Sequence, residues 1–301
     1  MAQPTVVRLP AGTPVDEVLE VLDRDGGVVV TNLISQEILD QVARELKPHE
    51  QPDQVWKGNF FPEATKRICG AFGKSQTYAK EIFLNPLYQE ICQRRLTITK
   101  KSRYGDEIRT FVCKPIGNTS TMFDIGPGAE AQQLHRDDGV QHIEHPTKQP
   151  TLMNMLVAQT RTTPENGATV VIPGSHKWPD LEDSHPLPEQ AIPVCLEPGD
   201  ALIFDGAVFH GGGANVTKAE RRKVLGAFMV QGNLRSEENI FLHFNPSVAK
   251  EYPTEALEAY GYKAASSGLG WVDYREPLDA VLGRGKPAPG SLDFGNVGIT
   301  V

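Results

Sequence analysis

The sequence predicts a mainly β protein with flanking helices, organised as a β-sandwich or jelly roll. From about residue 108 onwards, short runs rich in β-branched and aromatic residues alternate with turns such as Pro198-Gly199-Asp200. Before that point, and again after Asn245, apolar residues recur at helical spacing. Many short strands separated by turn residues are typical of a sandwich or jelly roll.

Three segments of the first third have helical signatures. The first carries apolar residues at the spacing i, i+3, i+4, i+7, namely Val15, Val18, Leu19 and Leu22. Gly26-Gly27 ends that helix, and Val28-Val29-Val30 is expected to form a short buried strand. Ser35 is a good N-cap for a second helix, and Asn85-Pro86 opens a third.

The strands of the expected core follow from about residue 108. The runs that predict them are 110–114, 121–125, 152–159, 168–172, 192–196, 201–204 and 224–230. Residues 49–70 and 117–131 show no clear period, which suits either lids over a site or ordinary surface loops. A helical stretch over 249–262 leads into a Gly/Pro-rich tail that we expect to wrap the body.

We expect one domain over residues 1–301, because neither an internal repeat nor a low-complexity linker divides the chain. Within it, a helical part spans about 1–107, the jelly-roll core about 108–235, and a C-terminal helix and tail about 236–301.

Composition excludes several classes of protein. The net charge of -8, without any Lys/Arg-rich run, argues against nucleic-acid binding. No stretch approaches the ~20 apolar residues of a membrane span, and the N-terminal residues lack the pattern of a signal peptide. The 4 cysteines are scattered without a CxxC pair, so we expect free thiols and a cytoplasmic location.

A candidate metal site begins at His135 and Asp137. On an extended segment, residues two apart point to the same side, so an imidazole and a carboxylate can face one ion. Such a pair alone is expected about once by chance in a chain with 8 His and 38 Asp and Glu. The signal strengthens with His210, which follows the turn and buried strand of Pro198 to Phe204. Two histidines and one aspartate are the facial ligand set suited to non-haem Fe(II), with positions left for a bidentate cosubstrate and O2.

Arginine completes the chemistry. Bound through its 2-oxo group and one carboxylate, 2-oxoglutarate leaves a distal carboxylate that needs a cation, and guanidinium pairs with carboxylate in bidentate fashion. Arg221 stands eleven residues after His210, although the adjacent Arg222 is an alternative.

The chain resembles the phytanoyl-CoA dioxygenase-like branch of the Fe(II)/2-oxoglutarate oxygenases. The pieces that carry the resemblance are His135-x-Asp137, Glu165-Asn166-Gly167-Ala168-Thr169, Ile172-Pro173-Gly174-Ser175-His176, Pro198-Gly199-Asp200, His210 with Asn215, and Arg221. The HRDD, ENGAT, GSHKW and HGGGAN strings are most similar to fungal enzymes that tailor meroterpenoids and alkaloids, endoperoxide-forming members included.

This resemblance implies a double-stranded β-helix core, iron with 2-oxoglutarate and O2, and a homodimer. It also implies that Gln132 and Thr169 contact 2-oxoglutarate, with Gln133 as an alternative to Gln132. The implied reaction oxidises an unactivated C–H bond of a bulky, mainly apolar small molecule by hydroxylation, desaturation, rearrangement or endoperoxide formation. Succinate and CO2 are the coproducts.

Simpler interpretations remain for other residues. We expect structural or surface roles for His49, His142, His145, His185 and His243. His176 is expected to support a turn, and Asp138 to lie behind the ligands or face solvent. Aromatic and sulfur side chains that suit either the core or a substrate pocket are Trp56, Phe60, Phe61, Met122 and Phe123. The alternative function is a non-catalytic metal-binding jelly-roll module.

Overall fold

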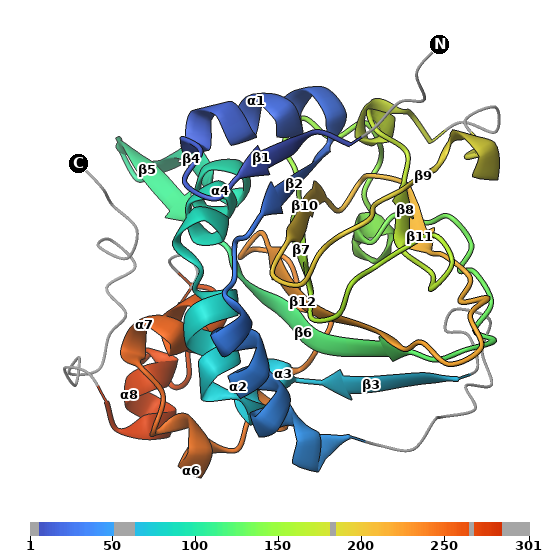
Figure 1. Ribbon diagram of the computed structural model, residues 1–301. Helices are drawn as coiled ribbons and strands as arrows, with labels where there is room; N and C mark the ends of the chain where they lie inside the picture. The colour runs from blue at the N-terminus through green and yellow to red at the C-terminus, as the bar shows by residue number, and fades with distance from the viewer. Residues whose placement is uncertain (1–5, 51–63, 181–184, 265–267, 285–301) are drawn as a thin grey trace.

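The computed structural model describes residues 6–50, 64–180, 185–264 and 268–284. Its largest element is a seven-stranded sheet with the strand order β1-β2-β10-β7-β12-β6-β3, and a three-stranded sheet has the order β11-β8-β9 (Figure 1). Strands β4 and β5 form a separate hairpin. The bounds are β1 (Arg8–Pro10), β2 (Gly27–Thr31), β3 (Thr65–Cys69), β4 (Ile98–Tyr104), β5 (Glu107–Cys113), β6 (Ile116–Ile125), β7 (Leu152–Ala158), β8 (Thr169–Val171), β9 (Ile192–Pro193), β10 (Ala201–Asp205), β11 (His210–Gly212) and β12 (Arg222–Val230).

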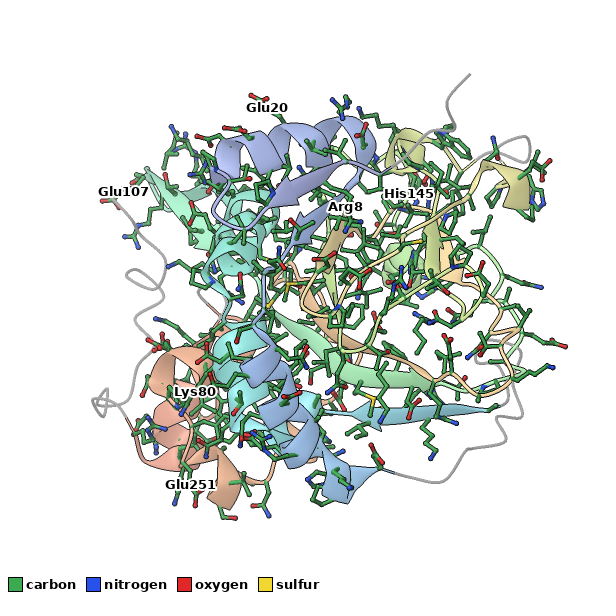
Figure 2. All side chains as sticks on the ribbon, in the orientation of Figure 1. Arg8, Glu20, Lys80, Glu107, His145 and Glu251 are labelled. Atoms are coloured by element: carbon green, nitrogen blue, oxygen red, sulfur yellow. The ribbon has the colours of Figure 1, made fainter. Side chains whose placement is uncertain are left out.

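The large sheet is buried on both faces. On β10, Ala201 and Ile203 pack into a core shared with the helices, whereas Leu202 and Phe204 pack into a second core shared with the small sheet. Successive side chains of a strand point to opposite faces, so one strand serves both layers. Figure 2 shows side chains filling the space between the large sheet and the helices and the space between the two sheets. Two facing sheets with helices outside the larger one confirm the predicted jelly-roll class.

Helices cover the outer face of the large sheet (Figure 1). They are α1 (Val15–Asp25), α2 (Gln36–Leu46), α3 (Ala71–Lys74), α4 (Pro86–Leu96), α5 (Ile240–His243), α6 (Pro246–Ala249), α7 (Thr254–Leu257) and α8 (Pro277–Leu282), with π-helical turns at Tyr78–Phe83 and Glu258–Tyr262. The three predicted N-terminal helices are confirmed. Gly26 ends α1 with φ of 76°, and the Ser35 hydroxyl accepts a hydrogen bond from the backbone N–H of Ile38 at the start of α2.

One expectation for the fold was wrong in part. Residues 117–131 are not a surface loop in their first half, because strand β6 runs through Ile125 between β12 and β3. The predicted helical part over residues 1–107 also contains β1 to β4, and among these β2 confirms the expected strand at Val28 to Val30. The stretch 249–262 is broken into short helices, and Gly261 interrupts it with φ of 127°. The expected wrapping tail lies largely outside the described residues.

No helix in the described ranges combines the length and apolar character needed to cross a membrane. All four cysteines are free, as expected, with Cys92 and Cys113 buried.

The C-terminal helices are fastened to the body by an aromatic cluster around Phe72 of α3. The Phe72 ring stacks on Tyr260 with centroids 3.8 Å apart and contacts the edge of Phe83 at 5.1 Å. We expect Phe72→Ala to lower the free energy of unfolding by about 3–5 kcal/mol, because it removes a fully buried ring. Urea-induced unfolding measures this loss, with Phe72→Leu expected to cost less. A change below about 1 kcal/mol would contradict this account of the cluster.

Candidate metal centre

The three predicted ligands are brought together by an antiparallel pairing of two segments. His135 and His210 form a β-bridge in which each backbone N–H donates to the other's carbonyl, at 2.9 and 3.0 Å. The backbone N–H of Asp137 donates to the carbonyl of Gly206 at 2.9 Å. This pairing sets the two histidines side by side, with ring centroids 4.5 Å apart.

The ligand atoms converge as a metal site requires. One nitrogen from each of His135 and His210 and one oxygen of Asp137 all lie within 4.8 Å of one another. Nε2 of His135 is 3.5 Å from Oδ1 of Asp137, and Nε2 of His210 is 3.4 Å from Oδ2. Among the residues that the structure describes, this is the one His/Cys/Asp/Glu group with such geometry. Two imidazoles and one carboxylate fit a ferrous ion.

Hydrogen bonds behind the ligands orient them. Nδ1 of His135 lies 2.8 Å from the carbonyl of Gln133, and Nδ1 of His210 lies 3.0 Å from that of Val208. A carbonyl only accepts hydrogen bonds, so each Nδ1 carries a proton and each Nε2 presents its lone pair to the centre.

Electrostatics keep the carboxylate ligand ionised. Burial raises the pKa of Asp137, but the charge and hydrogen bonds of His210 and His135 outweigh it, and the pKa lies below its usual range. Burial lowers the pKa of His210, and attraction to Asp137 more than offsets this, so the pKa lies above its usual value. A metal ion at this position would replace the proton that the carboxylate otherwise attracts.

The centre opens into a cavity of ≈ 530 Å³. Its walls combine the three ligands with apolar side chains, which include Phe123, Ile125, Val140, Leu156, Phe204, Val224 and Phe228. Phe123 therefore lines the pocket, whereas Met122 on the other face of β6 belongs to the helical core. Trp56, Phe60 and Phe61 lie outside the described residues.

The two candidate arginines point in different directions. Arg221 pairs with Asp124, with its Nε 2.7 Å from Oδ1, and it is absent from the cavity wall. Arg222 lines the cavity and is 4% exposed. Arg222 rather than Arg221 therefore faces the cavity, because side chains alternate along β12 and the even positions face inward.

Arg222 is a buried cation that still needs an anion. Its Nη1 lies 3.4 Å from Oγ1 of Thr169, its Nε has no hydrogen-bond partner, and it forms no ion pair with any residue in the described part of the chain. Burial lowers the pKa of Arg222 to about 10, so it remains charged at neutral pH. A buried unpaired charge is costly, which makes this side chain a fitting partner for a carboxylate ligand.

The remaining predicted contacts also reach the cavity. Gln132 and Thr169 both line it, whereas Gln133 does not and is exposed. The side-chain oxygen of Gln132 accepts a hydrogen bond of 2.8 Å from the backbone N–H of Gly212, which holds this side chain beside β11.

Sequence reasoning missed Asn154. This fully buried side chain donates a 2.7 Å hydrogen bond to Oδ2 of Asp137 from the middle of β7. The available signal was a single amide inside the apolar run Leu152 to Ala158, since a polar group buried among apolar neighbours needs a specific partner.

Comparison with known proteins identifies the family. The model of the phytanoyl-CoA dioxygenase family matches residues 22–223. This chain belongs to the phytanoyl-CoA dioxygenase family. A similar relative, the dioxygenase peniF of Penicillium patulum, is 35% identical over 293 residues, which cover 94% of this chain and 92% of the relative. The predicted membership and the classification as a dioxygenase are confirmed.

Solved structures support the same fold. The epimerase SnoN from nogalamycin biosynthesis, described as non-haem and α-ketoglutarate-dependent, superposes with a TM-score of 0.55 at 18% identity, over 72% of this chain and 81% of SnoN. HygX from Streptomyces hygroscopicus, solved with nickel and 2-oxoglutarate bound, superposes with a TM-score of 0.54 at 17% identity, over 74% of this chain and 89% of HygX. At such identities the likeness establishes the shared architecture of this family member.

We expect His135→Ala to abolish tight binding of Fe(II), because two ligands cannot replace the facial set of three. Metal content after anaerobic loading and desalting measures this, and His185→Ala, at an exposed histidine, is the control that should load like the wild type. Full loading of the His135 variant would show that the metal lies elsewhere.

Proposed function

We propose that this dioxygenase is a non-haem Fe(II)/2-oxoglutarate-dependent oxygenase of fungal secondary metabolism. It oxidises an unactivated C–H bond of a bulky terpenoid or meroterpenoid by hydroxylation, desaturation, rearrangement or endoperoxide formation. The observation that carries the proposal is the combination of the His135, Asp137 and His210 set with the unpaired, buried Arg222 on one cavity.

Each residue has a role in this proposal. His135, Asp137 and His210 hold the iron, and Arg222 binds the distal carboxylate of 2-oxoglutarate, with Thr169 and Gln132 beside it. When bound, the iron and cosubstrate supply the oxidising chemistry, in which 2-oxoglutarate and O2 give succinate and CO2 and one oxygen atom remains for the substrate. The protein orients the substrate and keeps water from the reacting atoms.

The cavity wall suits a mainly apolar small molecule. A volume of ≈ 530 Å³ falls within the usual range for small-molecule sites, and most of the area of the cavity wall is apolar. Arg67, Glu130 and Glu237 also line it and would contact polar groups of such a substrate. Asp137 argues against a halogenase, in which a halide takes the place of the carboxylate ligand.

The proposal extends to a cytoplasmic homodimer. The free cysteines agree with a reducing compartment. Exposed apolar side chains are frequent in the C-terminal part of the described chain, namely Phe241, Leu242, Val248, Leu269, Trp271, Val272, Tyr274 and Val281. A homodimer would give such side chains a partner surface to pack against.

The two arginines provide a matched pair of variants. We expect Arg222→Ala to weaken 2-oxoglutarate binding by about 2–5 kcal/mol, the scale for removing one partner of a buried charge pair. Arg221→Ala should leave binding nearly unchanged, because that side chain pairs with Asp124. Titration of the Fe(II)-loaded protein with 2-oxoglutarate under anaerobic conditions measures both. The reverse pattern would return the role to Arg221.

Succinate release tests the activity itself. Protein incubated with Fe(II), ascorbate, 2-oxoglutarate and a panel of terpenoids and meroterpenoids should release succinate, with a matching oxidised product for an accepted substrate. Omitting Fe(II) should abolish the release. A protein that binds iron yet releases no succinate under any of these conditions would be a non-catalytic metal-binding module.

A further inference from the structure

We propose that His145 is a positioning residue of the metal centre, which joins Asp138 to Asp180 and thereby holds Asp137 in the direction of the two histidine ligands. The proposal rests on the metal site described above and assigns a role to a histidine that the sequence places among structural ones.

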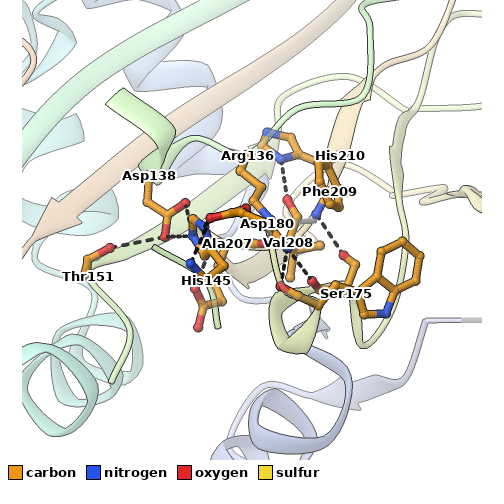
Figure 3. A network of polar contacts seen from close by, with 12 residues as sticks. Arg136, Asp138, His145, Thr151, Ser175, Asp180, Ala207, Val208, Phe209 and His210 are labelled. Atoms are coloured by element: carbon orange, nitrogen blue, oxygen red, sulfur yellow. Dashed lines mark hydrogen bonds and ion pairs between the residues drawn. The ribbon is translucent and has the colours of Figure 1, made fainter. Parts of the chain in front are cut away.

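His145 lies between two carboxylates and is almost entirely enclosed. Its Nε2 is 3.0 and 3.1 Å from the two oxygens of Asp138, and its Nδ1 is 2.8 Å from Oδ2 of Asp180 (Figure 3). The side chains of His145 and Asp138 are 3% and 0% exposed. The imidazole therefore bridges the two carboxylates through its two ring nitrogens.

This group is not a second metal site. The two carboxylates face opposite nitrogens of one ring, so they cannot hold a common ion, and within the described ranges the one candidate metal group is the ligand set already described. His145 therefore connects two side chains of this chain and holds no metal ion.

The connection reaches both residues that flank Asp137. Asp138 binds His145 and also accepts a 3.2 Å hydrogen bond from Oγ1 of Thr151. Asp180, on the other side of His145, forms an ion pair with Arg136. The segment 136–138 is thus held at both ends by one continuous chain of contacts.

The same chain reaches the other half of the ligand set. Arg136 donates from Nε to the carbonyl of Ala207 at 3.0 Å and from Nη2 to those of Ser175 and Trp178 at 3.1 and 2.8 Å. Its guanidinium carbon lies 4.3 Å from the centre of the Phe209 ring. Because Ala207 and Phe209 lead directly into His210, the contacts made by His145 and Arg136 fix the two ligand-bearing segments relative to each other (Figure 3).

Asp137 needs this support because the strand-like pairing ends before it. His135 is in a β-bridge, but Asp137 has φ of -75° and ψ of -35°, and a 3-10 helix begins at Asp138. Beyond its backbone bond to Gly206 and the side-chain bond from Asn154, the direction of Asp137 depends on how its neighbours are held.

The test compares His145→Gln with a matched control. Nη2 of Arg8 lies 2.6 Å from Oδ2 of the buried Asp200, far in the sequence from the segments that carry the ligands. Arg8→Gln therefore also removes the ion pair of a buried carboxylate. Both variants should unfold at lower urea concentration than the wild type. We expect only His145→Gln to weaken Co(II) binding to the metal-free full-length chain, by about 10- to 100-fold, the usual effect of losing a residue that orients a ligand. The visible spectrum of bound Co(II), which reports ligand geometry, should change in this variant alone.

Each outcome decides one question. Wild-type affinity and spectrum in a folded His145→Gln variant would overturn the positioning role. Equal loss of Co(II) affinity in both variants would also overturn it, since general loosening would then be the cause. Failure of the wild-type chain to bind Co(II) would instead overturn the metal site. Should His145→Gln not fold, Asp180→Ala, at a half-exposed side chain, removes the contacts of this carboxylate to both His145 and Arg136, and unchanged Co(II) affinity there would equally reject the role.

Discussion

The site depends on one backbone pairing, the β-bridge between His135 and His210. Two backbone hydrogen bonds make neighbours of these residues, which are 75 positions apart in the sequence. Beside the bridge, the backbone N–H of Gln132 donates to the carbonyl of Gly212 and continues the pairing. Glycines next to the bridge allow a second close approach of backbones, between residues 167–168 and residues 213–214. A Cβ on Gly213 would lie 2.8 Å from the carbonyl oxygen of Ala168, and one on Gly167 would lie 2.5 Å from that of Gly213. The HGGGAN and ENGAT strings therefore encode close packing of backbones beside the ligands.

The sequence predicted three candidate metal ligands that the structure brings together, because two histidines and a carboxylate in this arrangement are chemically specific. It could not decide between Arg221 and Arg222, since that choice depends on whether the odd or the even positions of β12 face the cavity. A one-residue shift turns every side chain of a strand to the other face. On this strand both faces are apolar: Val224 and Phe228 face the cavity, whereas Leu225 and Met229 face the helices. A strand buried on both sides carries no contrast from which its register can be read.

The start of the segment taken for a possible loop, residues 117–120, illustrates the same limit in another way. Polar residues follow one another along β6, yet Asn118 and Ser120 are fully buried. Their partners come from the far C-terminal part: the Asn118 amide donates to Glu237 at 2.7 Å, and the Ser120 hydroxyl lies 3.2 Å from that of Tyr260. Contacts with residues more than a hundred positions away extend the strand predicted at 121–125 back through this polar stretch, and local patterns do not reveal such contacts.

The buried charges of the cavity are best understood together. Asp137 contributes one negative charge and Arg222 one positive charge to the cavity wall. Each charge is costly to bury without a partner, so each requires a partner of opposite charge. In the proposed complex a ferrous ion would be held beside Asp137, and a dicarboxylate would bring one carboxylate to the metal and a second to Arg222. A monocarboxylate bound to the metal would leave the arginine without an anion. The buried guanidinium therefore favours 2-oxoglutarate over a simple 2-oxo acid.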